Sequence, residues 1–295
     1  MKHAEFEEKE YEGFLYSELD RGVSRFWHPG QVLENYLGFD RAMFLDDPYF
    51  WRMHGIRGAK RGLLLSGFPW PFLPRKLKFR LPRFRYNCFV QAKRPQYGSR
   101  LPLSLSALGT TRPFFKFQID TDQQATLEAA AARLRRRALF CYAAPVFFKS
   151  RDLFRYDTAG SIVANSTFPD IDRLAGQHAW YYNQPGASGI ANRSYEHLQM
   201  PPLNERVEEL IRADDRHTEE TQSPSAALGE LFHALEGLFK ENHDLAADPR
   251  AAYLTTEWRR ISALADEIEA PPALLSFLSI EAFAVYFNLV WLTIA

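Results

Sequence analysis

Alternating and continuous hydrophobic stretches predict the elements in the middle of the chain. Residues 85–92 alternate, are rich in Tyr, Phe and Val, and are followed by Pro95, which favours a strand that stops there. Residues 114–119 predict a second, short strand. Residues 122–137 are Ala-rich, begin with Asp and end in arginines, as a helix does. Residues 138–148 are continuously apolar and predict a buried strand.

The flanking parts of the chain carry weaker patterns. Helical spacing predicts helices over residues 5–19 and 31–37, with a strand over 39–45 after Gly38. Repeated prolines make residues 48–82 an insertion or extended arm, and residues 94–113 and 150–200 are expected to be irregular or loop-rich. The last third predicts four helices, over residues 203–213, 225–242, 249–269 and 272–294.

Composition places the chain among globular proteins of a reducing compartment. It has 295 residues, 46% of them hydrophobic and 24% charged. Its two cysteines, Cys88 and Cys141, fall in predicted buried strands and form no metal-binding or disulfide pattern. The first residues are acidic and polar, unlike a signal or transit peptide, so we expect a cytoplasmic protein.

A formal net charge of zero conceals an uneven distribution of charge. From Pro48 to Ile119 there are 15 Lys or Arg and no Asp or Glu. This basic run is either one face of a fold balanced by the acidic C-terminal third, or a surface that binds a polyanion. We prefer the second interpretation because aromatic residues such as Trp51 and Trp70 alternate with the charge. The predicted nucleic-acid contacts are Arg75, Lys76, Lys78, Arg80, Arg83 and Arg85.

The end of the strand at residues 85–92 carries the main chemical signal. Alternation places Gln91 and Lys93 on one face, with an amide oxygen beside an ammonium group. This Gln-x-Lys ending resembles the third motif of the PD-(D/E)xK nuclease superfamily, in the Gln variant common among Mrr-like restriction endonucleases. The predicted order helix, strand, strand, helix, strand is similar to the superfamily's core. The resemblance covers residues 5–150.

The resemblance implies a divalent-metal site with hard oxygen ligands beside a cation. An Asp is needed upstream, and Asp40, Asp46 and Asp47 are available; we choose Asp40, at the start of a strand expected to pair with residues 85–92. For the additional Glu we choose Glu34, with Glu18 second and Glu12 as a further competitor. The implied ligands of Mg²⁺ or Mn²⁺ are therefore Asp40, Gln91, the Ala92 carbonyl and Glu34, with Lys93 acting on the attacking water.

Two departures from the family's pattern concern Asp40. Gly38-Phe39 stands where the family has a Pro before its Asp, and the long separation of Asp40 from Gln91 requires residues 46–82 to be an insertion.

The fold expected is α/β, with a restriction-endonuclease-like mixed-sheet core in residues 1–200 and a helical region in residues 201–295. The function implied is metal-dependent hydrolysis of phosphodiester bonds in DNA, with RNA as a less favoured substrate, in defence against foreign DNA and within a larger defence complex. The alternatives are a non-catalytic nucleic-acid-binding protein with a decayed nuclease core, or a scaffold subunit that docks an acidic partner through its basic run.

The last hydrophobic stretch, residues 273–295, is long enough to span a bilayer. Glu281 near its middle, Asn288, and the lack of any Lys or Arg after Arg260 argue against a membrane anchor. We therefore expect no membrane association. A buried C-terminal helix shared across a homodimer is the preferred interpretation.

Overall fold

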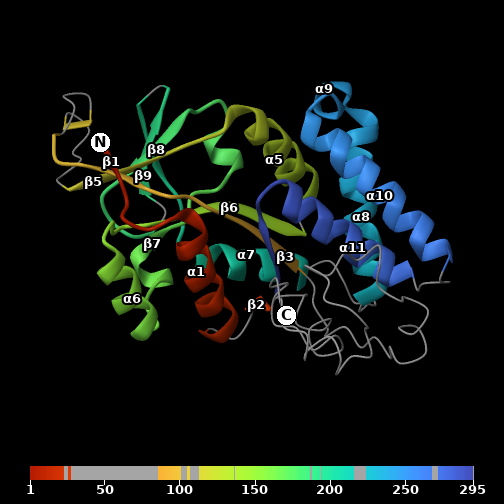
Figure 1. Cartoon of the computed structure of the whole chain (residues 1–295), viewed down its shortest axis with the longest axis horizontal. Helices are drawn as coiled ribbons and strands as arrows, with labels where there is room; N and C mark the ends of the chain where they lie inside the picture. The colour runs from red at the N-terminus through yellow and green to blue at the C-terminus, as the bar shows by residue number, and fades with distance from the viewer. Residues whose placement is uncertain are drawn as a thin grey trace, which may run out of the picture.

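The computed structural model describes most of the chain outside the basic run. The described residues are 1–22, 26–27, 86–100, 105–106, 113–135, 137–186, 188–193, 195–215, 224–267 and 272–294. They form a mixed α/β structure with two sheets and a group of helices formed by the C-terminal third (Figure 1). The predictions for residues 31–37, 39–45 and 48–82 lie outside this range.

A five-stranded sheet carries the centre of the fold. Its order is β2 (Phe26–Trp27), β11 (Val290–Ile294), β3 (Tyr86–Ala92), β6 (Ala138–Pro145) and β7 (Ser166–Thr167). β3 and β6 are parallel, with Gln91 opposite Tyr142, and the other pairings are antiparallel. The strands predicted at residues 85–92 and 138–148 are confirmed. Helices cover both faces, so β3 is buried along its length and β6 is buried except at Leu139; for β6 the continuous hydrophobicity of its sequence indicated this.

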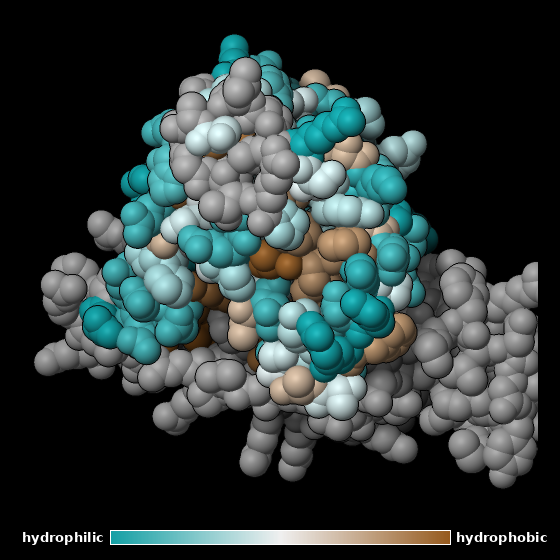
Figure 2. Space-filling model, turned by 90° about the vertical axis from the view of Figure 1, so that its left-hand side faces the viewer, coloured by the Kyte–Doolittle hydropathy of each residue, from teal (hydrophilic) through white to brown (hydrophobic). Residues whose placement is uncertain are grey.

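The sequence patterns did not predict most of the second sheet. Its six antiparallel strands are β1 (Lys2–His3), β4 (Gln96–Gly98), β5 (Phe114–Gln118), β8 (Ala179–Tyr182), β9 (Ser188–Asn192) and β10 (Glu196–Gln199). Only β5 was predicted, and the loops expected in residues 150–200 are partly β8 to β10. The side of the molecule that lies to the left in Figure 1 shows hydrophobic residues gathered at the centre of a largely hydrophilic face (Figure 2).

Eight helices accompany the sheets in the described part of the chain. They are α1 (Glu8–Gly22), α5 (Thr121–Leu134), α6 (Ser150–Thr158), α7 (Leu203–Asp215), α8 (Pro224–Glu241), α9 (His243–Ala246), α10 (Pro249–Glu267) and α11 (Pro272–Tyr286). Asp120, just before α5, caps its first turn by accepting hydrogen bonds from the amides of Asp122 and Gln123. The helices predicted in these regions are thus confirmed, apart from the end of the last one.

The two faces of the five-stranded sheet bury different sets of side chains. Cys88 and Cys141 lie on the face covered by α1 and α7, and both thiols are fully buried as expected. Phe89 and Trp291 lie on the opposite face, in the core shared with α5, α8 and α11. Since Gln91 and Lys93 follow Phe89 at intervals of two, their side chains belong to this second face.

The prediction of one helix over residues 272–294 is wrong in its last third, because α11 ends at Tyr286. The chain leaves α11 through Asn288, whose φ of +49° is left-handed, and continues as β11. β11 lies along one edge of β3, from Val290 opposite Val90 to Ile294 opposite Tyr86. β6 occupies the other edge of β3, so both edges of this strand are paired with described residues, whereas residues 39–45, the partner expected from the sequence, lie outside the described range.

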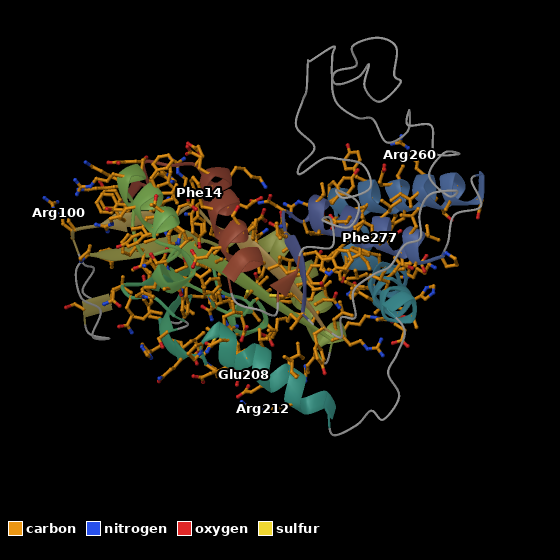
Figure 3. The ribbon with its side chains drawn as sticks, turned by 90° about the horizontal axis from the view of Figure 1, so that it is seen from below. Phe14, Arg100, Glu208, Arg212, Arg260 and Phe277 are labelled. Atoms are coloured by element: carbon orange, nitrogen blue, oxygen red, sulfur yellow. The ribbon has the colours of Figure 1, made fainter. Side chains whose placement is uncertain are left out.

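Within the described residues, no helix combines the length and the hydrophobicity needed to cross a bilayer. α11 instead packs against α8 and α10, and its Phe277, labelled in Figure 3, is buried against Trp291 of β11 with 5.5 Å between the ring centroids.

Candidate active site

The end of β3 brings Gln91 and Lys93 to the place where two parallel strands finish together. The backbone amide of Lys93 donates to the carbonyl of Ala143 at 2.8 Å, which extends the ladder one residue beyond the strand. The Lys93 ammonium lies 5.2 Å from the centroid of the Tyr142 ring, and Tyr142 is opposite Gln91 in register. The two side chains of the Gln-x-Lys ending therefore lie on the same face, above β6.

Gln91 is buried and leaves one hydrogen-bond acceptor unused. Its side chain is 1% exposed, and its Nε2 donates to the carbonyl of Phe287 at 2.9 Å. Gln123 on α5 donates to the same carbonyl. The buried Oε1 of Gln91 receives no hydrogen bond from any residue the structure describes. A buried amide oxygen without a donor is costly, and it is also a neutral oxygen ligand of the kind a hard cation accepts.

The surroundings of Lys93 lower the pKa of its side chain. Burial lowers the pKa of its ammonium group, and the positive charge of Arg250 lowers it further. The carboxylates of Glu8 and Asp120 act in the opposite direction but do not cancel the effect of burial. A lysine of this kind is neutral at lower pH than an exposed one, which suits a base acting on water.

Asp120 links this corner of the sheet to the C-terminal helices. Its carboxylate caps α5 and forms an ion pair of 2.9 Å with Arg250 on α10. Partial burial acts to raise the pKa of Asp120, but the amide of Gln123 and the charge of Arg250 outweigh it, so the pKa is lowered. Asp120 therefore stays ionised and contributes a fixed negative charge beside Lys93.

Glu8 is the second carboxylate near Lys93. It lies in the first turn of α1, where it accepts from the backbone amide of Arg94 at 3.2 Å and from the side-chain amide of Asn288 at 3.0 Å. Sequence reasoning missed both Glu8 and Asp120 because their closeness to Lys93 depends on how α1 and α5 pack. The one local signal was the position of Asp120 immediately before a strong helix.

A hydrogen-bonded network supports Tyr142 beneath the Lys93 ammonium. The Tyr142 hydroxyl donates to Oε1 of Gln124 on α5, and Nε2 of Gln124 donates to the carbonyl of Ile171 at 2.8 Å. Burial raises the pKa of Tyr142, so the ring stays neutral and offers its π-face to the ammonium. These hydrogen bonds hold the Tyr142 ring in place, and the ring in turn positions the Lys93 ammonium group.

The other glutamates considered for the site are placed differently. Glu18 accepts hydrogen bonds from the amides of Ile162 and Val163, at the 3₁₀ helix Val163–Asn165, and Glu12 pairs with Lys9 at 2.8 Å. Neither is brought to Lys93. Glu34, Asp40, Asp46 and Asp47 lie outside the described residues, so their roles stay predictions.

The predicted nucleic-acid contacts also lie outside the described part of the chain: Arg75, Lys76, Lys78, Arg80, Arg83 and Arg85. Among the residues that are described, no three His, Cys, Asp or Glu side chains converge as a metal site. The orphaned Gln91 oxygen fits a metal ligand, and the predicted carboxylates Asp40 and Glu34 would have to complete the set.

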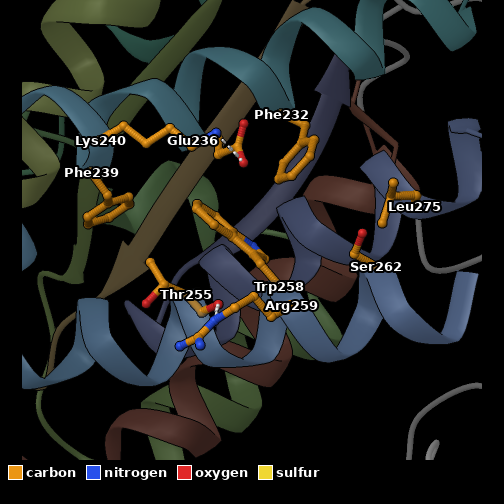
Figure 4. Close-up of a pocket in the computed structure, with 9 residues that line it drawn as sticks. All are labelled: Phe232, Glu236, Phe239, Lys240, Thr255, Trp258, Arg259, Ser262 and Leu275. Carbon is orange, nitrogen blue, oxygen red and sulfur yellow. Dashed lines mark hydrogen bonds and ion pairs between the residues drawn. The ribbon is translucent and has the colours of Figure 1, made fainter. Parts of the chain in front are cut away.

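A cavity of about 350 Å³ lies apart from this site, among the C-terminal helices (Figure 4). Trp258 stands at its centre between Phe232 and Phe239, both in edge-to-face contact with the indole. Glu236 and Lys240 form an ion pair of 2.8 Å at its wall and so neutralise each other. Since no member of the Lys93 cluster lines it, this cavity is not part of the candidate active site.

Comparison of the chain with protein-family models, with curated proteins and with solved structures finds no match.

Proposed function

We propose that the protein is a metal-dependent endonuclease that hydrolyses phosphodiester bonds in DNA. The observation that supports this most is the end of β3, where a buried amide oxygen without a donor stands beside a lysine of lowered pKa. A restriction-endonuclease-like core, with Gln91 and Lys93 as its third motif, accounts for both features. In this proposal the ligands of Mg²⁺ or Mn²⁺ are Gln91, the Ala92 carbonyl, Asp40 and Glu34.

Lys93, Glu8 and Asp120 each have a defined task in the proposed reaction. Lys93, held over Tyr142, orients the attacking water, takes its proton when neutral, and stabilises the anionic phosphorus when charged. Glu8 and Asp120 adjust the proton affinity of Lys93 from two sides. The bound cation would lower the pKa of the water and offset charge on the leaving oxygen. The basic run at residues 48–119 would hold the DNA backbone.

Plasmid cleavage tests this proposal directly. Supercoiled DNA is incubated with the protein and Mg²⁺ or Mn²⁺, and nicked and linear products are followed on a gel. Lys93→Ala should lower the rate by about 10²- to 10⁴-fold, as removal of a general base does. Lys149→Ala is the matched control, because Lys149 lies outside the basic run and also over an aromatic ring, at 5.6 Å from the centroid of Phe148. Wild-type cleavage by Lys93→Ala would refute the proposed site.

A non-catalytic nucleic-acid-binding protein is the second candidate, and the acid-free basic run favours it. Neutralising Arg75, Lys76, Lys78 and Arg80 together should reduce the dependence of log K on log salt by up to about 4 units for either nucleic-acid function. Binding without metal-dependent cleavage would identify this second candidate. An unchanged salt slope would instead favour a scaffold subunit with an acidic protein partner.

The homodimer and the larger defence complex remain part of the proposal. Two copies would supply two active sites, as cleavage of both DNA strands requires. Light scattering would show a particle of twice the 34.1 kDa chain mass if the dimer forms.

A further inference from the structure

A second cavity, of about 540 Å³, is lined by residues from the end of α5, from β6 and from α7. We call it the arginine cavity, because Arg135 after α5, Arg173 in the 3₁₀ helix Asp172–Leu174 and Arg206 on α7 contribute to its wall. Apolar residues supply much of the remaining surface, among them Leu139, Met200 and Leu210. Leu139 packs with the core under α1 and α7, whereas Met200 belongs to the core shared with α5, so the cavity has walls from both cores; neither Lys93 nor Tyr142 lines it.

Arg206 is the buried member of this cavity, with only 5% of the residue exposed. One terminal nitrogen is paired with Asp170, and the other donates to the carbonyl of Phe168. Its Nε has no acceptor among the residues that the structure describes. The guanidinium is therefore fixed in orientation and is short of one acceptor.

The charges around the arginine cavity do not balance. Asp170 is already neutralised by Arg206, which leaves Glu209 as the other carboxylate of the wall. Arg135 and Arg173 are exposed, and neither forms an ion pair with another described residue. A planar guanidinium recognises oxyanions such as phosphate and carboxylate through paired hydrogen bonds. The apolar residues next to it would hold a ligand body that water solvates poorly.

We propose that the arginine cavity binds an organic anion with an apolar body and a phosphate or carboxylate head. The body lies against Leu139, Met200 and Leu210, and the head is held by Arg135 and Arg173 next to the fixed Arg206. Because neither Lys93 nor Tyr142, Glu8 or Asp120 lines this cavity, the ligand is distinct from the substrate at the candidate active site, and the proposal does not depend on nuclease activity.

Calorimetric titration with four probes on the full chain tests this inference. The probes are 1-naphthyl phosphate, 1-naphthoate, 1-naphthalenemethanol and inorganic phosphate. At least one naphthyl anion should bind about tenfold or more tightly than the neutral alcohol, which corresponds to about 1.4 kcal/mol. The tighter of the two anions identifies the head group. Equal binding of the alcohol, equal binding of inorganic phosphate, or no binding of either naphthyl anion at millimolar concentration would overturn the proposal.

Substitutions locate the binding in the cavity. Arg173→Gln and Arg135→Gln should each weaken the tighter anion by roughly 5- to 10-fold, because each removes one charged contact. Both side chains are exposed, so the fold should tolerate these changes, whereas a change at buried Arg206 would test folding as well as binding. Arg212→Gln is the control: Arg212 is on the outer side of α7, paired with Glu208 at 2.6 Å (Figure 3). Unchanged affinity in both cavity variants would place any binding elsewhere and refute the assignment.

Discussion

The ammonium group of Lys93 lies above the ring of Tyr142, which is the residue opposite Gln91 in the parallel pair of strands. The register between β3 and β6 therefore determines the relative positions of Gln91, Lys93 and Tyr142. A shift of β6 by one residue would turn the tyrosine to the other face and remove the support of the lysine. Substitutions that change the charges around this ammonium group should therefore change how cleavage depends on pH.

Glu8→Gln and Arg250→Gln should move the pH dependence of cleavage in opposite directions. Cleavage should rise with pH as Lys93 loses its proton, with a midpoint below the ordinary lysine pKa of 10.5. Arg250→Gln removes a charge that lowers the Lys93 pKa, so the midpoint should rise. Glu8→Gln removes a charge that raises this pKa, so the midpoint should fall. The measurement is the initial rate of plasmid nicking between pH 6 and 10, and shifts of the same sign in both variants would contradict the role of Lys93.

Gln91→Glu tests whether the orphaned oxygen meets a metal ion. A carboxylate buried at this position without a donor should lower the melting temperature in EDTA. Mg²⁺ or Mn²⁺ should restore it, because the charged ligand binds the cation more tightly than the amide does. Gln123→Glu is the matched control, since Gln123 is also buried and donates to the same Phe287 carbonyl. Equal recovery of both variants, or of neither, would argue against a metal at Gln91.

Asp40→Asn should abolish metal-dependent cleavage, because a neutral amide is a poor substitute for a charged ligand. Asp46→Asn and Asp47→Asn should retain wild-type rates, measured with the same plasmid assay. Loss of activity in Asp47→Asn together with an active Asp40→Asn would move the site while leaving the class of enzyme unchanged.

Leu292→Ala should destabilise the protein by about 2–5 kcal/mol, as the loss of a large core side chain does. Leu292 is fully buried in β11, opposite Cys88 in the central strand. Val285→Ala on α11 should change the free energy of unfolding by less than about 0.5 kcal/mol, because Val285 is 71% exposed. Urea unfolding followed by circular dichroism measures both. Similar small effects would mean that β11 contributes little to the core.

Local signals predicted those elements that could be recognised without knowing their partners. The helix of residues 121–134 carries its own cap, and the strand of residues 138–145 is apolar throughout. Residues 290–294 were assigned to a helix because a buried strand and a buried helix have the same unbroken hydrophobicity. Asn288, together with the β-branched Val290 and Thr293, was the available sign of a break.

The candidate site was predictable only where its residues are neighbours in the sequence. The shared face of Gln91 and Lys93 follows from strand geometry alone. Glu8 and Asp120 come from two helices that meet the end of β3 only in the folded protein, and no pattern in their own segments indicates this. Strand β9 was also not predicted, because it depends on a contact between strands: Gly189 has no side chain and so leaves room for Trp180 on the neighbouring strand β8.

The position of β11 has a consequence for the synthesis of the protein. Val90 and Val290, which pair in the sheet, are 200 positions apart in the chain. At about 5–20 residues per second, a ribosome needs roughly 10–40 s to make the intervening chain. During this time one long edge of β3 has no native neighbour and is available to other strands. A nascent chain that stops before residue 290 cannot complete the layer that carries Gln91 and Lys93, so incomplete products are expected to be captured by chaperones and to cut no DNA.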